Sequence, residues 1–103
     1  MALVATILSA ATGTGAGSSK ELPDGVKSIQ ASIAGTGSLT ATVAIEVSND
    51  NVNWLSESDS TMSLSGTTAA SAGLILSVGW KYLRANVTAI SGTSAAVSVY
   101  VGY

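Results

Sequence analysis

The chain has 103 residues, a formal net charge of -2, and no cysteine or histidine. The missing side chains exclude disulfides, thiolate nucleophiles, the common zinc ligands and the usual proton carrier near neutral pH. Charged residues make up 10% of the chain, against about 25% in ordinary soluble domains. Only four residues are basic, which argues against the counterion release that duplex nucleic-acid binding needs. We therefore expect one domain over residues 1–103 that is no enzyme and binds neither nucleic acid nor a cofactor.

The apolar segment Met1–Ala11 predicts a first strand. Alternate positions are apolar on both faces, as in a strand covered on two sides. The segment lacks the basic residues of a secretory signal and is shorter than the about 20 residues that span a bilayer. We expect no membrane attachment, with a cleaved signal as the alternative. The Gly- and Ser-rich segment Thr12–Ser19 predicts a flexible loop, so that residues 1–19 form either a strand and loop or an N-terminal arm.

Alternation resumes after a turn composition at Leu22–Gly25. Val26–Ile33 predicts a strand, and Gly35–Ser38 predicts a turn that sends the chain back. The clearest strand is Leu39–Val47, in which every second residue is apolar and predicted to face inward. Ser48–Asn53 then predicts a tight turn, because Asn and Asp side chains bond to their own backbone and tolerate left-handed conformations.

The second half of the chain predicts more short strands. A bent or interrupted strand begins at Trp54 and ends at Leu64, a loop follows at Gly66–Ala72, and another strand at Gly73–Val78. Trp80–Tyr103 alternates on both sides of a Ser-Gly-Thr segment, which predicts a terminal β-hairpin. No segment has a helical period. The expected fold class is all-β, an antiparallel β-sandwich or jelly roll of seven or eight short strands.

Two polar clusters have the composition of chemical sites. Glu57 and Asp59 would share one strand face, like the paired carboxylates of a glycosidase. We favour the alternative that they solvate an exposed strand. The Asn and Asp residues of Ser48–Asn53 offer oxygen ligands of the kind calcium prefers, but only one is charged, and we favour a turn without a metal.

Exposed aromatic and apolar side chains are candidates for contacts with other molecules. Flat rings stack on sugars, but in a core without phenylalanine Trp54 also suits a role as core or sheet-edge anchor. Tyrosine is enriched where proteins meet, and a strand with two apolar faces needs a second chain to cover it. No catalytic, cofactor or metal residues are expected. The candidate partner-binding residues are Leu3, Val4, Ile7, Leu8, Tyr82, Tyr100 and Tyr103.

Two motifs resemble those of small virion structural proteins of tailed phages. They are Ser-Asn-Asp-Asn-Val-Asn-Trp at 48–54 and Trp-Lys-Tyr-Leu-Arg-Ala-Asn-Val-Thr at 80–88, within a resemblance that covers Val26 to Val101. Asn51 stands where glycine is common in such turns, and Asn can replace it because it accepts a positive φ. The resemblance implies a structural protein without catalytic residues. Similar sandwiches serve as capsid decoration or cement proteins and as tail or fibre modules.

The function expected from these observations is capsid decoration at the virion surface. The chain would bind the major capsid protein over junctions between its subunits as a homo-oligomer, with a trimer favoured. Association with a fixed lattice multiplies weak contacts, so an almost neutral surface can suffice. The alternatives are a phage tail or fibre module, or a carbohydrate-binding sandwich that recognises host glycan.

Overall fold

The computed structural model describes residues 4–21, 23, 25–78 and 80–103, without the side chains of 57–59 and 76–78. All regular structure in this part is β, and the strands pair antiparallel. The expected all-β antiparallel class is therefore confirmed. In chain order the strands are β1 Val4–Ala11, β2 Gly15–Ala16, β3 Lys20–Glu21, β4 Gly25–Ser48, β5 Leu55–Val78 and β6 Tyr82–Gly102.

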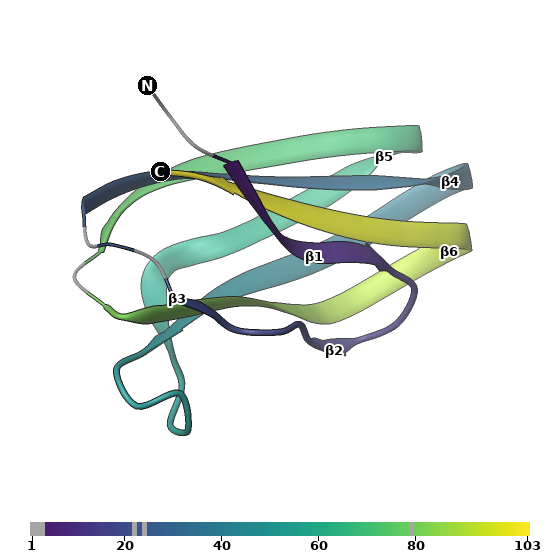
Figure 1. Ribbon diagram of the computed structural model, residues 1–103. Helices are drawn as coiled ribbons and strands as arrows, with labels where there is room; N and C mark the ends of the chain where they lie inside the picture. The colour runs from purple at the N-terminus through teal and green to yellow at the C-terminus, as the bar shows by residue number, and fades with distance from the viewer. Residues whose placement is uncertain (1–3, 22, 24, 79) are drawn as a thin grey trace.

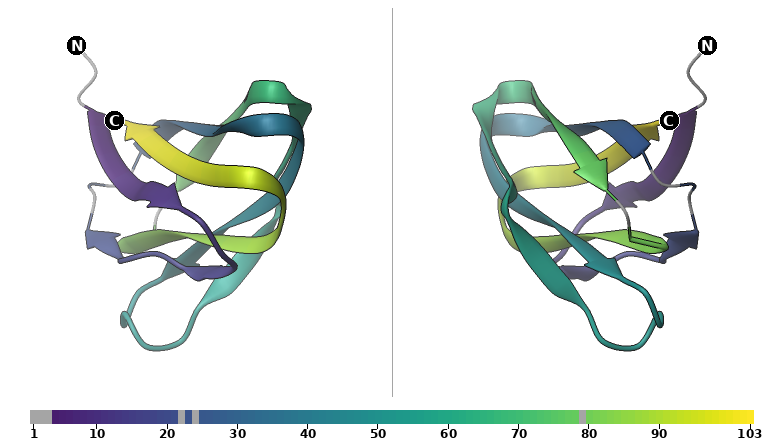
Figure 2. Two further views of the ribbon diagram at one scale, coloured as in Figure 1. Left: turned by 90° about the vertical axis from the view of Figure 1, so that its right-hand side faces the viewer. Right: turned by 90° about the vertical axis from the view of Figure 1, so that its left-hand side faces the viewer.

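Most of the fold consists of three long strands, β4, β5 and β6. Each of them bends sharply in its middle (Figure 1). β4 lies between the other two and pairs with both along nearly its whole length, so the sheet order is β1-β6-β4-β5. The register of both ladders shifts just after Ala34 of β4. At this level the sheet folds over on itself into two layers (Figure 2).

Each layer takes one half of every long strand. The first layer consists of β1, residues 95–102 of β6, 25–34 of β4 and 69–78 of β5. The second layer consists of β2, β3, residues 82–90 of β6, 38–48 of β4 and 55–67 of β5. The halves of the three long strands together with β1 make seven strand segments, in line with the expected number.

Three of the predictions are wrong: the turn at Gly35–Ser38, the loop at Gly66–Ala72 and the terminal hairpin at Trp80–Tyr103. At each of these places a strand bends and continues into the other layer. A hairpin would pair the two halves of β6 with each other, but both halves pair with β4. A bend and a turn both need unusual backbone angles, so the Gly, Ser and Thr residues at these places are compatible with either. The residues at the bends with positive φ are Gly37, Thr68, Gly92 and Ser94.

The core lies between the two layers and is almost entirely aliphatic. Every second residue of Leu39–Val47 is buried, as expected from the alternation. One inward position is basic: Lys27, 1% exposed, lies at the end of the core, where its ammonium donates to the carbonyl oxygens of Pro23 and Gly25. The core residues are Ile7, Ile29, Ala31, Ile33, Leu39, Ala41, Val43, Ile45, Val47, Met62, Leu64, Leu83, Ala85, Val87, Ala95, Val97, Val99 and Val101.

The N-terminal segment runs along β6 in both layers. The expected first strand is confirmed as β1, which pairs with the C-terminal half of β6. The segment Thr12–Ser19, expected as a flexible loop, instead contains β2 and a backbone hydrogen bond from Gly17 N to Ala85 O of 2.7 Å. With β3 it closes the edge of the second layer beside β6. A glycine-rich composition predicted mobility, but these residues find backbone partners on a neighbouring strand.

Close packing at the bend makes Gly92 a sensitive position. Its φ is +131, and a Cβ there would lie 2.5 Å from Leu39 Cδ2 and 3.0 Å from the Ser38 carbonyl oxygen. Leu39 is buried directly beneath the bend. Only glycine fits both the backbone angle and the space.

We predict that Gly92→Ala lowers the free energy of unfolding by about 2–4 kcal/mol, since the backbone angle costs about 1–3 kcal/mol and the crowding adds to it. Urea unfolding measures this change. Gly13→Ala is the matched control because a Cβ at Gly13 meets nothing within 4 Å. Equal stability of the two variants would contradict this account of the bend.

Candidate docking surface

Among the described residues, the outward side of the first layer carries no charged side chain, and we call it the neutral face. Alternation with the buried residues of the same strands identifies its members. It combines exposed aliphatic side chains with hydroxyl and amide groups. The neutral face consists of Val4, Thr6, Val26, Ser28, Gln30, Ser32, Ser71, Gly73, Ile75, Ser98 and Tyr100.

Large apolar side chains are unusually exposed on this face. Val4, Val26 and Ile75 are 71%, 67% and 75% exposed, and Tyr100 is 36% exposed. Strand register sets Val4 and Ile75 at the two ends of one row across the sheet, and Tyr100 in the adjacent row. Covering this face would remove apolar surface from water, which contributes a favourable free energy of about 25 cal/mol per Å² of apolar area buried. No charged group of the face would lose its hydration. The face therefore suits contact with another protein surface.

The structure brings two of the predicted partner-binding residues, Val4 and Tyr100, together on the neutral face. Leu3 lies outside the described residues. The prediction that Ile7 faces a partner is wrong. Ile7 is buried in the core because one side of β1 faces the other layer. The alternation in β1 could not reveal this, since both of its sides are apolar.

The remaining predicted residues do not join that face. Leu8 and Tyr103 are half-buried and pack against the core. Tyr82 is half-buried at the start of β6 in the second layer, with Lys81 Nζ 5.5 Å from the centre of its ring. Sequence reasoning missed Val26 and Ile75. Alternation marks both as outward, but only the pairing register shows that they share a face with Val4 and Tyr100.

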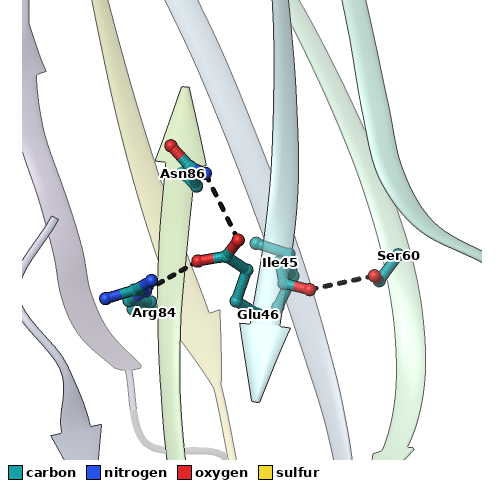
Figure 3. Close-up of polar contacts among 5 residues, drawn as sticks. All are labelled: Ile45, Glu46, Ser60, Arg84 and Asn86. Carbon is teal, nitrogen blue, oxygen red and sulfur yellow. Dashed lines mark hydrogen bonds and ion pairs between the residues drawn. The ribbon is translucent and has the colours of Figure 1, made fainter. Parts of the chain in front are cut away.

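The outward side of the second layer differs because it carries charged groups, of which Arg84 and Glu46 bind each other (Figure 3). Arg84 Nε of β6 lies 2.7 Å from Glu46 Oε1 of β4, and Asn86 Nδ2 donates to Glu46 Oε2 at 3.3 Å. The Arg84 guanidinium also lies 4.3 Å from the centre of the Trp54 ring. One face of Trp54 is therefore covered by a cation, which fits its interpretation as a sheet-edge anchor better than as an open platform for sugar.

The predicted turn at Ser48–Asn53 is confirmed, and Asp50 organises it. Asp50 Oδ1 accepts hydrogen bonds from Val52 N at 2.9 Å, from Asn53 N at 2.8 Å and from Ser48 Oγ at 2.8 Å. Asp50 Oδ2 accepts one from Asn53 Nδ2 at 2.8 Å. Asn51 has a φ of 61, the positive angle expected of it. These carboxylate oxygens bond within the turn, and no group of three or more His, Cys, Asp or Glu side chains that could hold a metal ion occurs among the residues described.

Acid should weaken this turn. The hydrogen bonds to the carboxylate, with the one from the Asn53 backbone as the largest contribution, hold the pKa of the Asp50 carboxyl well below its usual range. A depressed pKa in the folded state stabilises the fold above the unfolded value near about 4, and this stabilisation is lost as the pH falls further.

We predict that the wild type has a higher melting temperature than Asp50→Asn at neutral pH. The difference between the two melting temperatures should shrink steadily below about pH 4. Thermal unfolding followed by circular dichroism over this pH range measures both. Glu21→Gln, at an exposed strand end, is the control for the loss of one negative charge. A difference that stays constant down to low pH would rule out this role for the Asp50 carboxylate.

Comparison with known proteins gives one structural similarity. No protein-family model matches the chain, and no curated protein matches it. The fold is similar to that of the SPBc2 prophage-derived protein YomS, with a TM-score of 0.61 and 15% sequence identity, over 100% of this chain and 94% of that one. The described part of the chain contains no helix that could span a membrane. At this level of identity the similarity establishes a shared fold.

Proposed function

We propose that the chain is a structural protein of a phage virion that binds the capsid surface through its neutral face, as a decoration or cement protein. The observation that carries the proposal is the combination of exposed Val4, Val26, Ile75 and Tyr100 with the absence of charged side chains among the described residues of the face. The chemistry of such a surface is suited to lying against another protein.

The physical argument concerns the cost of covering this face. Charged groups lose hydration when they are buried and need matched partners, whereas hydroxyl, amide and aliphatic groups need only hydrogen bonds and close packing. A single contact of this kind is weak. On a capsid the major capsid protein repeats the same contact, and a homo-oligomer that reaches several subunits gains avidity. The homotrimer expected from the sequence stays a prediction, and it is an alternative to the dimer that is inferred below from the edge of the sheet.

Two observations support the phage assignment. The fold is shared with a prophage-derived protein, and the turn at Ser48–Asn53 with the strand beginning at Tyr82 carries the motifs that resemble phage virion proteins. A tail or fibre module would be compatible with both observations. A sugar-binding module is less favoured, because Arg84 covers one face of Trp54.

We predict that Ser28→Lys with Gln30→Lys weakens binding to capsids that lack the protein by at least about tenfold, since burying two uncompensated ammonium groups costs several kcal/mol. Both residues are exposed at the centre of the neutral face. Cosedimentation with the particles measures binding. Thr40→Lys with Thr88→Lys, exposed in the second layer, adds the same charge elsewhere and should bind like the wild type. Unchanged binding of the first variant would reject the neutral face as the docking surface.

We also predict a copy number per virion of the same order as that of the major capsid protein. Quantitative mass spectrometry of purified particles measures it directly. A decoration protein covers a repeated surface, whereas a tail tip offers few positions. A handful of copies per particle would contradict decoration and favour the tail or fibre module.

A further inference from the structure

One edge of the sheet is regular, uncharged and uncovered. In the sheet order β1-β6-β4-β5, β5 is the last strand and pairs only with β4 among the described residues. Residues 69–78 of β5, which we call the free edge, form its half in the first layer. Along the free edge the register with β4 continues without a shift from Ala69 to Val78. In such a strand the backbone N–H and C=O groups of every second residue point away from the sheet.

The features that usually keep a sheet edge from pairing are missing here. The free edge contains no proline and no charged residue, and its ladder with β4 has no bulge. The opposite edge has one of these protections, because β1 shows two register shifts and Ala10 has a φ of 50. In the second layer the corresponding part of β5 has a register shift and contains Glu57 and Asp59 in its sequence. Only the free edge is both regular and neutral.

We infer that the free edge pairs antiparallel with the free edge of a second copy of this chain, across a two-fold axis. The segment is compatible with itself, because a strand without charge brings no like charges into opposition. Antiparallel pairing across a two-fold axis uses the same edge of both copies, so the assembly closes as a dimer. The outward backbone N–H and C=O groups of the two free edges would then hydrogen-bond to one another.

The same arrangement accounts for an exposed side chain at the edge. Ile75 is 75% exposed at the outer end of its row on the neutral face. Across a two-fold axis its neighbours would be outward residues of the partner's free edge, of which Ser71 and Gly73 are small. The four strands of each first layer would join into one continuous sheet, and the two neutral faces into one surface. This inference concerns a contact between copies and does not rest on the proposed function.

The test uses two charge variants of the full chain. Ser71→Lys with Ile75→Lys, and Ser71→Glu with Ile75→Glu, each set like charges opposite one another across the axis. Sedimentation velocity should show a dimer for the wild type and a dimer dissociation constant at least about tenfold higher for each variant. An equimolar mixture should form mixed dimers, because opposite charges then face each other. Circular dichroism checks that each variant is folded.

Ser28→Lys with Gln30→Lys is the matched control, because these residues lie on the same face, paired with Ile75 and Gly73, but on the inner strand β4. This variant should remain dimeric even though it is expected to lose capsid binding, so failure of the dimer and failure of the proposed docking are distinguishable. A control that also becomes monomeric would overturn edge pairing and indicate stacking of the neutral faces.

A measurement on the wild type keeps the test decisive if the variants do not fold. Hydrogen exchange of the amides in residues 69–78 should slow as the protein concentration rises, because their outward N–H groups become bonded in the dimer. A wild type that stays monomeric up to its solubility limit, or that forms a trimer, would overturn the inference. Exchange that does not depend on concentration would overturn it as well.

Discussion

The fold depends on one constraint, which is that β4, β5 and β6 must bend at the same level. Their backbone ladders hold them side by side, so no strand can change layers without its neighbours. The constraint is met by residues with positive φ at the bend of each strand, among them Gly37, Thr68 and Gly92. Leu39 packs beneath the bend, where Cβ atoms at Gly35 and Gly92 would lie 2.9 and 2.5 Å from its Cδ2. Packing and backbone conformation therefore define the same fold line.

This folding gives the molecule two outer surfaces of different chemistry. The second layer carries the Arg84–Glu46 ion pair, and Arg84 also lies over Trp54. Glu46 and Arg84 are thus engaged within the sheet, whereas Lys20 and Glu21 of β3 are exposed. The turn organised by Asp50 follows directly from β4. The first layer carries no outward charge and exposes aliphatic side chains. A surface that can be covered at little electrostatic cost lies on one side of the molecule, and stable, internally bonded polar groups lie on the other.

The two edges of the sheet differ as well. The N-terminal segment runs along β6 and covers that side of both layers with β1, β2 and β3. Within the described residues, no strand covers β5 on the opposite side. The composition of the chain is relevant here, since a formal net charge of -2 gives little repulsion between copies. Both the neutral face and the free edge thus suit association, and because they lie on the same layer the proposed dimer would present a larger docking surface than one chain.

The strand content, the inward residues of Leu39–Val47 and the turn at Ser48–Asn53 could be predicted from the amino-acid sequence alone, because alternation and side-chain-to-backbone bonds are local properties. Whether Gly35–Ser38 and Ser91–Ser94 reverse the chain or bend it became clear from the folded chain. The same small residues permit both, and the outcome depends on which distant strand supplies the backbone partners. The tertiary structure also buried Ile7 while leaving Val4 exposed, and it gathered Val4, Val26, Ile75 and Tyr100 on one face. Alternation separates inward from outward along each strand, but strand register alone sets outward residues of different strands beside one another.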